Sequence, residues 1–149
     1  MCQSCRKTCQ CGEQTAEIFF GRNILDEKAI KEVYCPKCSQ DVDRHGEGMV
    51  HDNGWILDLD MEVIRLSAPL MGILPQKVTA DQVFDEGYAT WVGITPDESE
   101  TRNRERAEIL KLAKVDLPAY LRAMKAWGMD RERRFTEEGW RKMQGRAKA

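Results

Sequence analysis

The residues of this sequence with the clearest capacity for chemistry are six cysteines, all within the first 38 of its 149 residues. They form three close pairs: Cys2 with Cys5, Cys9 with Cys11, and Cys35 with Cys38. Thiolate sulfur is a preferred ligand of zinc, which takes four such ligands in a tetrahedron. A tight turn carrying two cysteines presents both sulfurs on one side. The clustering therefore predicts a metal site built from two cysteine turns.

The turn from Cys35 to Cys38 is the stronger half of the predicted site. Pro36 follows the first ligand and restricts φ in the turn, and Lys37 is expected to be solvated. Cys9 and Cys11, which are separated by one residue (C-x-C), supply the other half. Gly12 lets the backbone turn sharply after them, before an expected strand at residues 16–20. The predicted metal ligands are Cys9, Cys11, Cys35 and Cys38.

Any four-ligand site leaves two cysteines over, so other arrangements stay open. Cys2 and Cys5 are the second choice for the first half of the site, in place of the C-x-C pair. A shared two-metal cluster, or a site that uses His45 or His51, is a further alternative. If they do not bind this ion, Cys2 and Cys5 would form a redox dithiol or hold a second metal together with a partner chain.

These residues resemble the zinc-ribbon or zinc-knuckle class of metal-binding modules. The resemblance rests on Cys9-Gln10-Cys11-Gly12 before a strand and on Tyr34-Cys35-Pro36-Lys37-Cys38, and it covers about the first third of the chain. It departs from the usual pattern because one turn is C-x-C instead of C-x2-C. The resemblance implies a structural zinc ion but no particular activity, since such modules serve proteins of many functions.

Iron is the alternative metal for the same residues. Two cysteine turns also build the one-iron site of proteins that look like rubredoxin, and ligand softness does not separate zinc from iron. The first four cysteines are spaced C-x2-C-x3-C-x-C, which differs from the C-x2-C-x2-C-x3-C-P run of bacterial ferredoxins. The spacing therefore disfavours a four-iron cluster.

Composition indicates a globular protein whose two parts carry opposite charge. The chain is 42% hydrophobic and 32% charged. Up to residue 101 it has 9 Lys+Arg against 18 Asp+Glu, and from residue 102 onward 14 against 7. No apolar run approaches the ~18 residues of a membrane span, and no apolar signal segment opens the sequence. We expect a cytoplasmic protein without membrane contact, in which clustered cysteines bind metal rather than form disulfides.

The first part of the chain is expected to contain a strand, a short helix and a β-hairpin. The helix begins at Asp26, whose side chain can cap it, and ends near Val33. The hairpin joins residues 49–51 to residues 55–57, because Asn53-Gly54 suits the two central positions of a type I′ turn.

The second part is expected to be mainly helical. Asp60 and Thr79 are predicted N-caps, and residues 88–94 form a short strand. Further helices start with Pro96 at the first position, at Asp116 and at Asp130, with Gly128 ending the one before the last. The predicted fold is α+β: a zinc-ribbon-like unit at residues 1–59 and a mainly helical region at residues 60–149, with a core that the two parts can share.

The sequence contains no motif for a known reaction. It lacks the phosphate-binding, dinucleotide-binding, zinc-protease and nucleophile-elbow patterns, and four thiolates leave a metal no open position. A non-enzymatic role is therefore favoured, as a zinc-binding accessory or adaptor protein with a protein partner. The alternatives are a rubredoxin-like electron-transfer protein and a nucleic-acid-binding regulator.

Nucleic-acid binding is not favoured, although the end of the chain is basic. The candidate phosphate contacts are Arg131, Arg133, Arg134, Arg141, Lys142, Arg146 and Lys148. Glu137 and Glu138 lie four residues before Arg141 and Lys142, a spacing typical of a solvated helix face with ion pairs. The acidic first part would also repel phosphate. A protein partner docking on the amphipathic C-terminal helices is the preferred interpretation.

Overall fold

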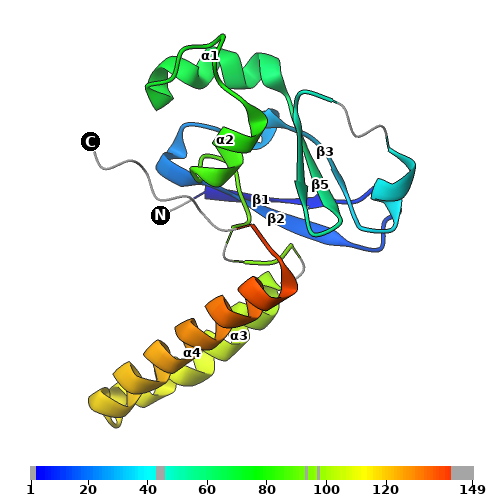
Figure 1. Ribbon diagram of the computed structural model, residues 1–149. Helices are drawn as coiled ribbons and strands as arrows, with labels where there is room; N and C mark the ends of the chain where they lie inside the picture. The colour runs from blue at the N-terminus through cyan, green and yellow to red at the C-terminus, as the bar shows by residue number, and fades with distance from the viewer. Residues whose placement is uncertain (1–2, 43–45, 93, 97, 142–149) are drawn as a thin grey trace.

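A computed structural model describes residues 3–42, 46–92, 94–96 and 98–141 of the chain. Two small antiparallel sheets and two helices, α1 (Met61–Met71) and α2 (Ala80–Asp85), form a body. Two further helices, α3 (Ser99–Leu110) and α4 (Leu117–Glu138), lie side by side and project from this body as an arm (Figure 1). The predicted α+β class is confirmed.

The first sheet is a hairpin of β1 (Gln3–Thr8) and β2 (Thr15–Phe20), paired from Gln3 opposite Phe20 to Thr8 opposite Thr15. The strand predicted at residues 16–20 is confirmed, because alternate apolar side chains of β2 face the core. β1 is largely exposed and polar, and its sequence carries no alternating apolar pattern that would predict a strand.

The second sheet has the strand order β3-β5-β4, with β3 (Ile30–Tyr34), β4 (Met49–Asp52) and β5 (Trp55–Leu59). The predicted β4–β5 hairpin is confirmed. Asn53 and Gly54 have φ of 49° and 90°, so both central residues of its turn adopt the positive φ that a type I′ turn requires.

The helix predicted from Asp26 to Val33 is wrong. The Asp26 side chain does accept from the Lys28 N–H at 2.9 Å, but it caps only a single 3₁₀ turn, Glu27–Ala29. The chain then continues as β3, whose residues Val33 and Tyr34 pair with β5. Pairing with β5 outweighs the local helix-start signal, because it provides partners for the backbone and buries Ile30 and Val33.

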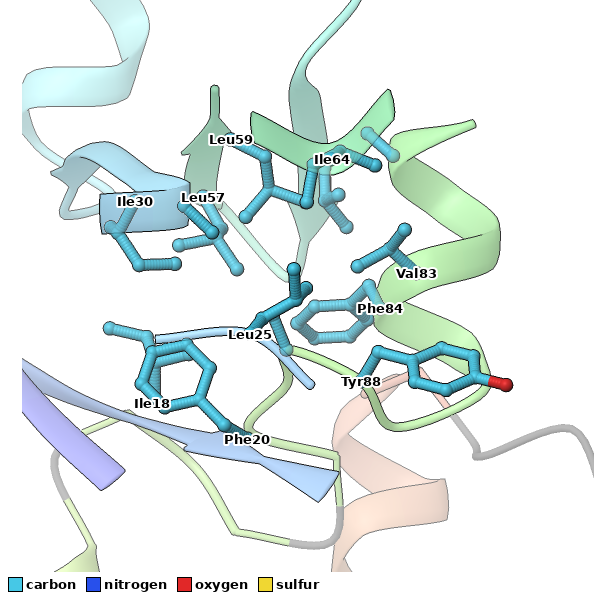
Figure 2. Packing of buried hydrophobic residues seen from close by; sticks show 14 of the residues in the cluster. Ile18, Phe20, Leu25, Ile30, Leu57, Leu59, Ile64, Val83, Phe84 and Tyr88 are labelled. Atoms are coloured by element: carbon cyan, nitrogen blue, oxygen red, sulfur yellow. The ribbon is translucent and has the colours of Figure 1, made fainter. Parts of the chain in front are cut away.

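One hydrophobic core joins the sheets to the two short helices. Its buried residues run from Cys9 to Trp91 and thus come from both sides of residue 59. Figure 2 shows Ile18 and Phe20 from β2 on one side and Ile64 and Phe84 from α1 and α2 on the other. The predicted N-caps are confirmed: Asp60 accepts from the Glu62 N–H, and Thr79 accepts from the Gln82 N–H, both at 3.1 Å.

Gly48 allows the backbone before β4 to lie against the end of β5. The Leu59 N–H donates to the Gly48 carbonyl at 2.7 Å, and a methyl group on Gly48 would overlap the Leu59 carbonyl oxygen. We expect Gly48→Ala to lower the free energy of unfolding by about 1–3 kcal/mol, the usual range for overpacking. Urea denaturation followed by circular dichroism measures this loss, and an unchanged midpoint would contradict it.

The strand predicted at residues 88–94 is wrong. Among residues 88–92 and 94, which the structure describes, only Thr90 pairs, and it exchanges two backbone hydrogen bonds with Phe19 at 2.8 and 2.9 Å. Beyond it the Thr90 side chain accepts from the Val92 N–H, and the Ile94 N–H donates to the Trp91 carbonyl, which turns the chain. Burial of Tyr88 and Trp91 in the core accounts for the apolar character that resembles a strand.

Two predicted helix boundaries in the arm are wrong. Pro96 does not begin α3, which starts at Ser99 after Glu98. Gly128 does not end a helix, because α4 runs unbroken to Glu138, and no separate helix begins at Asp130. The predicted cap at Asp116 is confirmed by a 3.1 Å bond from the Ala119 N–H. Trp127 and Arg134 lie on either side of Gly128 and bond to Glu105 of α3 and to its N-cap Glu98, which supports a continuous helix.

Arg141 ties the base of the arm to the body. Its guanidinium forms two hydrogen bonds to Asp85, at 3.0 and 2.6 Å, and one to Asp81 at 2.9 Å. Its backbone N–H donates at 2.9 Å to the buried carboxylate of Asp52, which also accepts from the Trp91 indole at 2.8 Å. One arginine therefore links the end of the arm to α2 and to β4.

Candidate metal centre

Four cysteines meet where the two sheets approach each other. Cys9 and Cys11 lie in the connection between β1 and β2, and Cys35 and Cys38 lie in the turn that follows β3. Their four sulfur atoms all lie within 4.8 Å of one another. Residues that are up to 29 positions apart in the chain thus form one compact cluster.

The first turn has a backbone suited to presenting two sulfurs together. The Cys9 N–H donates to the Gln14 carbonyl, and the Gly12 N–H donates back to the Cys9 carbonyl, both at 2.8 Å. Gly12 adopts a φ of 76°, which is unfavourable for residues with a side chain. The turn therefore depends on glycine directly after Cys11, as expected from the sequence.

The second turn rests on the β4–β5 hairpin. The Ser39 N–H donates to the Cys35 carbonyl at 2.8 Å, and the buried Ser39 hydroxyl donates to the Gly54 carbonyl at 2.6 Å. A Cβ on Gly54 would lie 3.2 Å from the Pro36 Cβ, so the hairpin turn and the cysteine turn pack closely. No sequence pattern signals the role of Ser39, because its partner lies 15 residues away.

The distances within the cluster are compatible with a tetrathiolate site. Zinc–sulfur bonds of ~2.3 Å give a tetrahedron whose edges are about 3.8 Å long. The Cys11 and Cys35 sulfurs are 3.8 Å apart. The Cys35 N–H also donates to the Cys9 sulfur at 3.3 Å, an interaction that orients a thiolate ligand. The cluster is compatible with one ion of this size, since all four sulfurs already lie within 4.8 Å of one another.

Two thiols of the cluster, Cys35 and Cys38, have pKa values shifted in opposite directions. Burial raises the pKa of Cys35, but hydrogen bonds from the Cys38 backbone and the neighbouring thiols outweigh it and bring the pKa to about 7. Hydrogen bonding with the Cys9 sulfur raises the pKa of Cys38 to about 12. Cys35 therefore ionises more readily than Cys38, because adjacent negative sulfurs repel each other and the second thiol keeps its proton.

The cluster is buried on one side and open on the other. Cys9 and Cys35 are 2% and 1% exposed and belong to the hydrophobic core, whereas Cys38 is half-buried and Cys11 is exposed. An ion can therefore enter from the Cys11 side. Once four thiolates surround it, no coordination position is left for water or substrate.

The remaining candidate ligands are not in this cluster or lie outside the described residues. Cys5 is in the middle of β1, opposite Ile18, and the four-sulfur group does not include it. Burial and the nearby Glu27 raise the pKa of the Cys5 thiol, which favours its protonated form. His51 is exposed in β4, and it is also outside the group. Cys2 and His45 are outside the described residues.

Comparisons with family models, with curated proteins and with solved structures find no match to this chain. The likeness to zinc-binding modules therefore rests on the cysteines and their geometry. Among the described residues, no helix has both the length and the apolar character needed to cross a membrane.

Proposed function

We propose that Cys9, Cys11, Cys35 and Cys38 bind one zinc ion as a structural centre in a non-enzymatic adaptor protein. The observation that carries this proposal is the gathering of four sulfurs within 4.8 Å, on two turns that each have their own backbone support. The described cysteines are all free thiols, as is usual in a reducing compartment, which supports a cytoplasmic location.

The position of the cluster supports a structural role for the ion. Cys9 connects to the first sheet and Cys35 to the second, and both side chains are part of the core. An ion bound by four thiolates here would cross-link the two sheets. Because a closed thiolate shell has no open position, the metal itself would not catalyse hydrolysis.

The arm supports the adaptor role. Of the described side chains in residues 98–138, only Arg131 is buried, so the two helices leave most of their surface free. The end of the arm exposes the large apolar side chains of Leu110, Leu112, Val115 and Leu117. Exposed apolar patches of this kind mark protein-binding surfaces. We assign this tip to a protein partner.

Elemental analysis of the purified protein tests the proposed metal. We expect one zinc per chain and no visible colour, since zinc has a filled d shell. Visible charge-transfer absorption with one iron per chain would overturn the zinc assignment in favour of the rubredoxin-like alternative. Folded, reduced protein without metal would overturn the site itself.

A further inference from the structure

The side of α4 that faces away from α3 is a continuous exposed stripe. Trp127 and Arg134 mark the side that faces α3, because they bond to Glu105 and Glu98 at 2.9 and 2.8 Å. The exposed stripe is named the α4 outer face here and comprises Leu121, Lys125, Gly128, Met129, Glu132 and Thr136. From Leu121 to Thr136 the stripe runs along about 22 Å of the ~33 Å length of α4.

Gly128 is the least expected residue on this face. Glycine in a helix interior costs about 1 kcal/mol relative to alanine. Gly128 does not have positive φ, and a Cβ on it would meet nothing within 4 Å, so the fold of a single chain does not require glycine there. A second helix crossing at this point would require it, because a residue without a side chain lets two helix backbones approach closely.

Exposed apolar side chains lie on both sides of Gly128 along the helix. Leu121 is 58% exposed and Met129 is 62% exposed. A shallow groove begins at Met129 and is lined by Met129, Glu132, Arg133, Thr136 and Glu137. Methionine packs well in irregular grooves, since its side chain is unbranched and flexible. The face thus has both a ridge and a groove for another helix.

The charges on the α4 outer face indicate which partner would bind to it. Lys125 lies three residues before Gly128, and Glu132 lies four residues after it. When two copies of α4 cross antiparallel at Gly128, Lys125 of each copy therefore comes opposite Glu132 of the other. The same symmetry brings Leu121 opposite Thr136. A face that is complementary to itself in this way suits a two-fold symmetric pair.

We infer that the α4 outer face pairs with the same face of a second copy of this chain, antiparallel and centred near Gly128. The arm projects away from both sheets, so the body does not cover this face (Figure 1). Pairing would bury Leu121 and Met129 and would leave the two arm tips at opposite ends of the dimer. The inference goes beyond the adaptor role and does not depend on the metal.

Sedimentation equilibrium of the full chain, loaded with its metal and at low salt, tests this dimer. We expect a reversible monomer–dimer equilibrium. Lys125→Glu and Glu132→Lys should each raise the dissociation constant at least about tenfold, because each places like charges opposite one another. The double variant restores opposite charges and should restore dimerisation. Circular dichroism checks that each variant keeps its helix content.

Lys77→Glu is the matched control, because it makes the same charge reversal at an exposed position on the body. We expect it to leave the dissociation constant unchanged. A chain that stays monomeric up to about 1 mM would overturn the inference. A dimer that both single reversals leave intact would also overturn it, since it would form through another surface. Neither result bears on the metal content, which elemental analysis measures separately.

Discussion

Replacing Cys35 with serine is expected to abolish metal binding and to destabilise the body by at least about 4 kcal/mol. Structural zinc sites contribute ~10–16 kcal/mol in zinc-finger peptides, so even a part of this energy is large beside the ~5–15 kcal/mol that stabilises a typical domain. Cys35 is buried, its N–H donates to the Cys9 sulfur, and its sulfur is 3.8 Å from that of Cys11. Its loss disturbs both turns at once.

Thermal unfolding and metal content of the variant measure this effect. Cys5→Ser is the matched control, because it makes the same substitution in β1 outside the four-sulfur group. We expect this control to keep its full metal content and to lose no more than about 1 kcal/mol, typical of a half-buried position. Equal metal loss in both variants would show that Cys5 is a ligand. A Cys35→Ser chain with full metal content would refute the proposed centre.

Replacing Arg141 with alanine is expected to lower the free energy of unfolding by about 2–3 kcal/mol and to loosen the arm. Removing one partner of a buried ion pair costs about 3–5 kcal/mol, and the partial exposure of the Arg141 side chain reduces this figure. The guanidinium pairs with Asp85 through two bonds and with Asp81 through a third. Without it, Asp85 keeps a charge that is only 15% exposed and has lost its partner.

Denaturant unfolding combined with hydrogen exchange measures both parts of this prediction. Faster exchange of α4 amides near Glu138 than in the unmodified chain would report the loosened base of the arm. Arg133→Ala is the control, because Arg133 is exposed and pairs only with Asp130 at 3.3 Å among the contacts described. It should change stability by less than about 1 kcal/mol. Equal effects of the two substitutions would contradict a specific link through Arg141.

The sequence predicted correctly those N-caps and turns that depend on residues only a few positions apart. Asp60, Thr79 and Asp116 are N-caps because each side chain reaches an N–H two or three residues ahead. Asn53-Gly54 specifies its hairpin because those residues tolerate positive φ. The grouping of Cys9 and Cys11 with Cys35 and Cys38 was likewise expected from the two close spacings. The boundary placed near residue 59 stays a prediction.

The errors occur where distant partners outweigh local preference. Residues 30–34 form a strand because an edge of β5 is available to them. The described residues of the segment 88–94 do not, because among them only Thr90 pairs, with Phe19. Gly128 stays helical because α3 contacts α4 on both sides of it. None of these partners can be identified from the residues that surround each error.

The sequence by itself determined which atoms are available to hold a metal and where tight turns place them in pairs. It also determined the helix starts at Asp60, Thr79 and Asp116 and the β4–β5 hairpin, since these depend on neighbours a few residues apart. Only the tertiary structure decided that the Cys9 and Cys35 turns meet, that Ser39 supports one of them, and that Arg141 bonds to Asp52 from 89 residues away. The physical reason is that such contacts depend on how the sheets pack, which no short stretch of chain encodes.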